Sequence, residues 1–148
     1  MYIAGTEYNL ERKCLEIYVC GCKAPHCDDC HNVGLWDFID HDNIEKYEKI
    51  ISEKIKSGMI NEFWILGGEP LDQNLYELEM FIFFLKEFDL DIWLWTRYTD
   101  FLHLNFLDML DYIKIGKYDR NLNSYVDKEH NITLASSNQK IINLKYWE

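Results

Sequence analysis

The chain has 148 residues, of which 48% are hydrophobic and 28% charged, and its 15 Lys and Arg against 26 Asp and Glu give a formal net charge of −11. This length and composition predict a single packed domain over residues 1–148 and exclude a collagenous or mostly disordered chain. The acidic balance argues against a nucleic-acid-binding protein, because contacts to phosphates need clustered Lys and Arg.

Hydrophobic patterning predicts alternating strands and helices, beginning in the first third of the chain. A β-prone run at 15–19 predicts a strand that leads directly into a cysteine-rich loop at 20–32. From Asn43 to Ser57, apolar residues recur at helical spacing, with Asp42 or Asn43 as the N-cap and Gly58 as the stop. The first unit is therefore a strand, a long loop and an amphipathic helix.

The pattern continues with a buried strand at 63–66, which ends at the Gly-Gly-Glu-Pro loop 67–70. The next helix is expected at 74–88, and its apolar surface is wide enough that much of it should be buried. The remaining expectations are a strand at 90–96, a short helix at 99–110, a strand at 112–115, a polar loop at 117–130, and a final strand pair formed by 132–134 and 141–144.

Strand and helix alternation is typical of right-handed βαβ units, so we expect an α/β fold with a mainly parallel sheet. Ligands of open α/β sheets bind at the carboxyl ends of the strands. Both unusual loops, 20–32 and 67–70, follow strands. The sequence therefore predicts that these two loops face one another.

The five cysteines are Cys14, Cys20, Cys22, Cys27 and Cys30, and none follows position 30. An odd, local set does not fit a disulfide framework, which would connect distant segments. The chain shows no signal-peptide pattern and no apolar run of about 18 residues, so we expect a cytoplasmic, reducing compartment and no membrane span.

Three thiols within nine residues, Cys22, Cys27 and Cys30, can hold one compact inorganic site. A structural zinc site would take His26 or His31 as a fourth ligand. A [4Fe-4S] cluster with one open iron needs only the three cysteines. Residue chemistry alone leaves both alternatives open.

The segment from Val19 to Cys22, the Cys27-Asp-Asp-Cys30-His31-Asn32 run and the following Trp36-Asp37-Phe38 resemble the cluster loop of radical S-adenosylmethionine enzymes. The similarity is to activating proteins of glycyl-radical enzymes, particularly the small activators of anaerobic ribonucleotide reductases. Gly67-Gly68-Glu69-Pro70 resembles the glycine-rich motif of that family, and residues 112–119 and 135–139 resemble its closing segments. The resemblance extends over about residues 15–143.

Two features depart from the family pattern. Four residues separate Cys22 from Cys27, where three are usual, so the extra residue either bulges near Pro25 or the cluster is held differently. Cys20 would give a still longer gap. Asp29 stands where many radical enzymes have an aromatic residue, and Thr96-Arg97-Tyr98 stands in place of Thr-Gly-Tyr.

The resemblance implies an incomplete (β/α) barrel and a [4Fe-4S] cluster on Cys22, Cys27 and Cys30. It also implies reductive cleavage of S-adenosylmethionine by that cluster. It assigns Gly67, Gly68 and Glu69 to the methionine end of S-adenosylmethionine, and the backbone of Asp29, Cys30 and His31 to its adenine. The chemistry belongs to the cofactors, so no catalytic side chain is assigned. Cys14 and Cys20 are expected to be reduced, partly buried bystanders, and the other histidines to be exposed or packed locally.

The implied reaction is formation of a glycyl radical on a large reductase subunit, with a flavodoxin or ferredoxin as electron donor. A chain this short covers only part of a barrel, so the partner would close the open side. The alternatives are a radical enzyme with a small-molecule substrate, similar to deazapurine synthases, and a non-catalytic zinc or iron–sulfur binding module.

Overall fold

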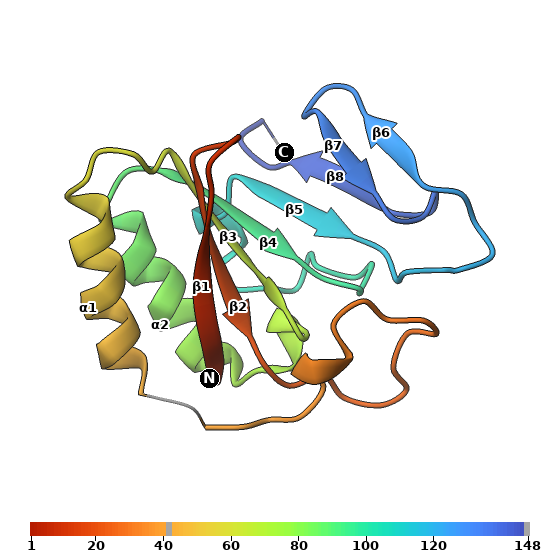
Figure 1. The fold of residues 1–148 in the computed structure, drawn as a ribbon, viewed down its shortest axis with the longest axis horizontal. Coiled ribbons are helices and arrows are strands. Elements are labelled where there is room, and N and C mark those ends of the chain that lie inside the picture. Colours follow the sequence, from red (N-terminus) through yellow and green to blue (C-terminus); the bar gives the residue numbers. More distant parts are fainter. Residues whose placement is uncertain (41–42, 147–148) are drawn as a thin grey trace.

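The computed structural model describes residues 1–40 and 43–146 and has a six-stranded sheet at its centre (Figure 1). The strands lie in the order β1-β2-β3-β4-β5-β8, and a separate hairpin pairs β6 with β7. The strands are β1 (Ile3–Asn9), β2 (Cys14–Val19), β3 (Glu62–Gly67), β4 (Asp91–Trp95), β5 (Tyr112–Ile115), β6 (Tyr125–Asp127), β7 (Ile132–Leu134) and β8 (Lys140–Asn143).

Strands β2, β3, β4 and β5 are parallel, whereas β1 and β8 run antiparallel at the two edges. This open, mainly parallel sheet confirms the predicted α/β class and agrees with part of a radical S-adenosylmethionine barrel. All four parallel strands end at the same edge, which brings the loops after β2, β3, β4 and β5 together.

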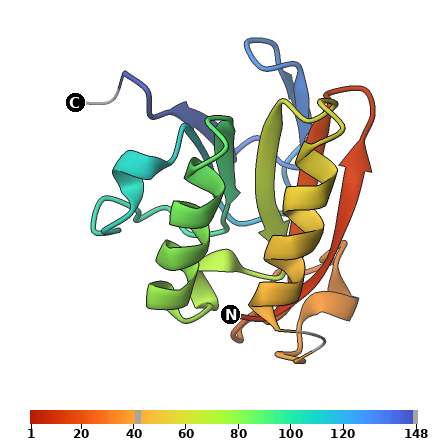
Figure 2. The same cartoon turned by 90° about the vertical axis from the view of Figure 1, so that its left-hand side faces the viewer.

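Helices α1 (Ile44–Ile55) and α2 (Leu75–Lys86) both cover one face of the sheet (Figure 2). Each begins at a predicted asparagine: the Asn43 side chain accepts a hydrogen bond from the Lys46 amide, and the Asn74 side chain accepts one from the Glu77 amide. Asp42, the other N-cap candidate, lies outside the described residues. The periodicity of the sequence therefore located both helices correctly.

The core lies between this helical layer and the sheet. It contains the inward side chains of α2 that were expected to be buried, while Leu75 at the start of the helix stays 41% exposed. The buried residues of α2 are Leu78, Phe81, Ile82 and Leu85. A second, smaller cluster on the opposite face joins Cys14, Trp64 and Trp93 to the β6–β7 hairpin.

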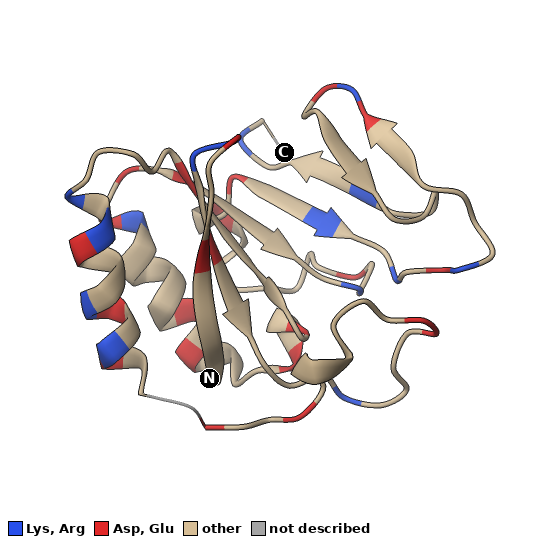
Figure 3. Cartoon of the chain, viewed as in Figure 1, with Lys and Arg blue, Asp and Glu red and all other residues tan. Residues whose placement is uncertain are grey.

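Charged residues of both signs line α1, whereas the inner strands carry few (Figure 3). None of the helices in the described part of the chain is long and apolar enough to cross a membrane.

Three expectations about secondary structure are wrong. Strand β1 was not anticipated, and β8 pairs with β5 while β7 pairs with β6, so 132–134 and 141–144 do not form a pair. The predicted loop 117–130 contains β6, which is too short for its pattern to stand out. Residues 99–110 form no α-helix; successive i→i+3 hydrogen bonds and a 3₁₀ turn at Leu107–Met109 place their apolar side chains in the core.

Candidate functional site

The cysteine loop is closed at its base by two backbone hydrogen bonds. The amides of Gly21 and Cys22 donate to the carbonyls of Leu35 and Trp36 at 2.8 and 2.9 Å. A 3₁₀ turn at Val33–Leu35 precedes this closure. Cys22, Cys27 and Cys30 therefore lie on one closed loop at the carboxyl end of β2.

The Gly-Gly-Glu-Pro loop lies directly against the base of the cysteine loop, as predicted. The Gly68 amide donates to the Val19 carbonyl at 2.8 Å, and the Glu69 amide donates to the Gly21 carbonyl at 2.9 Å. A Cβ on Gly68 would lie 2.7 Å from the Gly21 carbonyl oxygen and 2.8 Å from that of Leu35. The close approach that requires glycine here is thus between the two loops.

All three candidate ligands are free thiols of intermediate exposure. Burial raises the pKa of Cys22 to about 11, a shift that the positive charge of Arg97 opposes and the nearby Cys27 reinforces. The Asn32 amide donates to the Cys30 sulfur at 3.4 Å, a contact that suits a thiolate or a metal-bound sulfur. Three accessible thiols on one loop fit the ligand set of a cluster with one open iron.

Cys14 and Cys20 are fully buried, which exceeds the partial burial expected. The Cys20 thiol donates to the Ile39 carbonyl at 3.1 Å, so it is already bonded away from the other three. Cys14 packs in the tryptophan cluster behind the sheet, and burial raises its pKa strongly. Neither thiol is placed to replace Cys22.

His26 and His31, which flank the last two cysteines, lie against aromatic rings, whereas His41 lies outside the described residues. His26 stacks on Trp36 with ring centroids 3.9 Å apart, and its Nε2 lies 2.7 Å from the Cys22 carbonyl oxygen. The His31 ring lies edge-on to the Tyr118 ring, with the two ring centroids 5.1 Å apart. Among the described residues, no three Cys, His, Asp or Glu side chains converge on a point where one metal ion would sit.

The long spacer between Cys22 and Cys27 is held by Arg97, which follows β4. Its guanidinium donates to the carbonyls of Lys23 and Pro25 at 2.6 Å each and pairs with Asp72 at 3.2 Å. Asp72 also accepts hydrogen bonds from the Lys23 amide at 2.7 Å and the Tyr98 hydroxyl at 2.6 Å. The extra loop residue is thus fixed by side chains from two other loops.

Glu69 is 2% exposed and links the glycine-rich loop to the end of β4. Its Oε1 accepts from the Thr96 hydroxyl at 2.6 Å and the Leu71 amide at 3.0 Å, and its Oε2 accepts from the Arg97 amide at 2.8 Å. Burial raises its pKa, while these hydrogen bonds act in the opposite direction. Three of about four acceptor positions are filled, so one remains for another donor.

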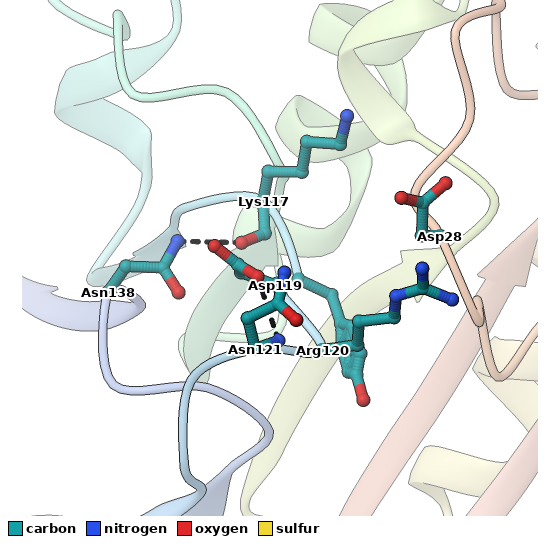
Figure 4. A pocket seen from close by; sticks show the side chains of 7 residues that line it. Asp28, Lys117, Asp119, Arg120, Asn121 and Asn138 are labelled. Carbon is teal, nitrogen blue, oxygen red and sulfur yellow. Dashed lines mark hydrogen bonds between the residues drawn. The ribbon is translucent and has the colours of Figure 1, made fainter.

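The other end of the cysteine loop faces the loop after β5. Asp29 has a φ of +54°, a left-handed conformation that turns the backbone sharply before Cys30. Its side chain forms an exposed ion pair with Arg120 at 3.4 Å. Between the two loops lies a pocket of about 320 Å³, to which the cysteine loop contributes Asp28 and the loop after β5 contributes Arg120 (Figure 4). Its lining residues are Asp28, Lys117, Tyr118, Asp119, Arg120, Asn121 and Asn138.

The two C-terminal segments singled out in the sequence pack against each other. The Asn138 side chain donates to the Lys117 carbonyl at 2.7 Å (Figure 4), and the Gln139 side chain donates to that of Gly116 at 3.2 Å. The Asp119 amide donates to the Ser136 hydroxyl at 3.1 Å. Residues 136–139 therefore shape the loop that borders the pocket.

Sequence reasoning missed four polar residues that build this site: Asp72, Gln73, Arg97 and Lys114. Gln73, 5% exposed, donates to the Cys20 carbonyl at 3.1 Å and accepts from the Tyr2 amide at 2.9 Å. Their positions directly after the Gly-Gly-Glu-Pro motif or at strand ends were the available signal. Most of their hydrogen-bond partners are distant in sequence, so the bonds could not be predicted.

Comparison with known proteins places the chain in a family. Residues 12–142 match the family model described as a 4Fe-4S single cluster domain. The anaerobic ribonucleoside-triphosphate reductase-activating protein of Enterobacteria phage T4 is 32% identical over 114 residues, which cover 72% of this chain and 71% of the phage protein. No solved structure matches the chain. The chain belongs to the family of anaerobic ribonucleoside-triphosphate reductase-activating proteins, which carry a 4Fe-4S single cluster domain of the radical S-adenosylmethionine type.

Proposed function

We propose that this protein binds a [4Fe-4S] cluster through Cys22, Cys27 and Cys30 and generates a glycyl radical on an anaerobic ribonucleotide reductase. The observation that carries the proposal is one closed loop with three accessible thiols, joined by backbone hydrogen bonds to the Gly-Gly-Glu-Pro loop. The family relationship supports the reaction, since the phage relative is a reductase-activating protein.

The chain's own contribution is to hold the thiols and shape their surroundings. A bound cluster would supply the electron for the cleavage of S-adenosylmethionine to methionine, and the 5′-deoxyadenosine product would carry the hydrogen atom taken from a glycine. Arg97 and Asp72 fix the backbone between Cys22 and Cys27. The Asn32 amide supports the Cys30 sulfur.

S-adenosylmethionine would lie between the cysteine loop and the Gly-Gly-Glu-Pro loop. The remaining acceptor position of Glu69 suits the amino group of its methionine part, beside the backbone of Gly67 and Gly68. Asp29 turns the backbone sharply before Cys30, and we assign the backbone of Asp29, Cys30 and His31 to the polar edge of adenine. The pocket between Asp28 and the loop 117–121 lies at this end and offers room for the nucleoside.

The reductase would approach the face of the sheet that the helices leave uncovered. At the carboxyl ends of β2, β3 and β4, the side chains of Tyr18, Leu66 and Trp95 remain partly exposed. Tyr18 and Leu66 are register partners, and Leu66 and Trp95 both pack against the second cluster. We assign this surface to the reductase loop that carries the target glycine. We assign electron delivery to a small donor of the flavodoxin or ferredoxin class.

Anaerobic reconstitution tests the ligand set. A brown protein that releases 5′-deoxyadenosine from S-adenosylmethionine under dithionite is expected, and colourless protein with stoichiometric zinc would contradict the proposal. Cys22→Ala should abolish cleavage, because it removes one of three ligands. Cys20→Ala should retain it, because that thiol bonds to Ile39. The reverse pattern would overturn the ligand assignment.

A further inference from the structure

A lysine is buried at the carboxyl end of β5, on the site side of the sheet. The sequence of β5 is YIKI, and its one charged residue, visible as a blue segment in Figure 3, is Lys114. Lys114 is 9% exposed. It lies beside Trp95 in the strand register, with its amine 6.0 Å from the centre of that ring. Lysine is almost never buried to this extent without a partner of opposite charge.

The hydrogen bonds of this amine do not neutralise its charge. Its Nζ donates to the carbonyls of Thr96 and Gly116 at 3.3 and 3.2 Å. Among the residues that the structure describes, no carboxylate lies within ion-pairing distance of it. An ammonium has three donors, so one is left for another acceptor. A buried cation without a counter-charge is costly, which indicates that an anionic group completes this site.

Two negative groups that act on the charge of the amine, Glu69 and Cys27, belong to the site. Burial lowers the pKa of Lys114 from 10.5 to about 8, and the charges of Glu69 and Cys27 oppose that lowering. The lysine is therefore still mostly charged at neutral pH. Glu69 is already occupied by the Thr96 hydroxyl and by two backbone amides. The Cys27 thiol must lose its proton to bind a metal, so it becomes anionic when it holds a cluster.

We propose that Lys114 is the counter-charge of the iron–sulfur cluster and that its charge stabilises the cluster's reduced state. This inference rests on the proposed function, because it takes Cys27 as a cluster ligand. Reduction adds one electron to a cluster whose three thiolates already make it anionic. A fixed positive charge in a site of low dielectric favours that added electron and raises the reduction potential.

The test is the midpoint potential of the reconstituted cluster, titrated with dithionite without S-adenosylmethionine and followed by electron paramagnetic resonance. Lys114→Met removes the charge and keeps the length of the side chain. We expect the equilibrium constant for reduction to fall about tenfold, which is about 59 mV more negative for a one-electron couple. Lys114→Arg should stay close to the wild-type potential.

Lys140→Met is the matched control, because Lys140 is the exposed register neighbour of Ile115 on β8. Its charge is screened by water, so the potential should not change. An unchanged potential in Lys114→Met overturns the inference, and weaker binding of S-adenosylmethionine alongside it would instead assign the lysine to that molecule's carboxylate.

If Lys114→Met holds no cluster, Lys114→Gln takes its place, since glutamine can still donate to a carbonyl. If neither neutral variant holds a cluster, the midpoint potential of Lys114→Arg, which keeps the positive charge, becomes the test. A cluster at wild-type potential in the arginine variant supports the inference, whereas its absence there means that shape, not charge, is required. Wild-type protein that binds no cluster would refute the proposed function itself, which separates the two failures.

Discussion

Arg97 provides the sharpest test of how the cysteine loop is held. Its guanidinium donates to the Lys23 and Pro25 carbonyls at 2.6 Å each and pairs with Asp72, whose side chain is 3% exposed. Removing one member of a buried charge pair costs about 3–5 kcal/mol. Asp72 keeps two other donors, so we expect Arg97→Met to destabilise the closed loop by about 3 kcal/mol. This corresponds to about a hundredfold larger open population.

Hydrogen exchange of the Lys23 amide measures this opening, because that amide donates to Asp72 at 2.7 Å. In apoprotein, under conditions where exchange follows the opening equilibrium, Arg97→Met should accelerate it about a hundredfold. Arg120→Met is the control: its ion pair with Asp29 is exposed, 55% and 65% for the two side chains, and contributes only about 0–1 kcal/mol. Acceleration of less than about threefold in Arg97→Met would refute the clamp.

Three further predictions concern the loops around the site. Gly68→Ala should reduce cluster retention severalfold after desalting, because its Cβ meets backbone oxygens at 2.7 and 2.8 Å, while Gly34→Ala, with nothing within 4 Å, should match wild type. Glu69→Gln should lower the urea-derived free energy of unfolding by about 1–3 kcal/mol, since an amide nitrogen would face a backbone donor; no loss would contradict the bonding described. In apoprotein, burial lowers the pKa of Lys114 from 10.5 to about 8. Between these pH values the amine holds its proton in the unfolded chain but not in the folded one, so the free energy of unfolding rises with pH, by up to about 3 kcal/mol. In urea titrations between pH 8 and 10.5, the free energy of unfolding should rise with pH more steeply for wild type than for Lys114→Met. An identical pH dependence in the two proteins would contradict the lowered pKa of Lys114.

The elements that could be predicted are those whose pattern is local and long. The helices at 44–55 and 75–86 and the central strands follow from periodicity and capping residues. Strand β1 was missed because its alternation is weak, and β6 because it has three residues in a polar segment, whereas β7 was predicted with its correct bounds but the wrong pairing partner. The segment 99–110 shows the limit of such patterns, since apolar residues spaced by three fit 3₁₀ turns as well as a helix.

The candidate site divides in the same way. The cysteines and the Gly-Gly-Glu-Pro loop stand out because their residue types are rare and closely spaced. Arg97 and Lys114 do not, because their roles come from contacts across the fold: Arg97 reaches carbonyls 72 and 74 residues away. The requirement for glycine at position 68 also comes from a contact across the fold, since its neighbour is the cysteine loop.

The central claim is that this chain places a radical on a glycine of a reductase. The most direct test mixes reconstituted protein, S-adenosylmethionine and a reductant with an anaerobic ribonucleotide reductase and records the electron paramagnetic resonance spectrum. We predict a glycyl-type doublet that requires Cys22, Cys27 and Cys30 and disappears when the target glycine is replaced by alanine. Reductive cleavage of S-adenosylmethionine with no doublet in the reductase would contradict the claim.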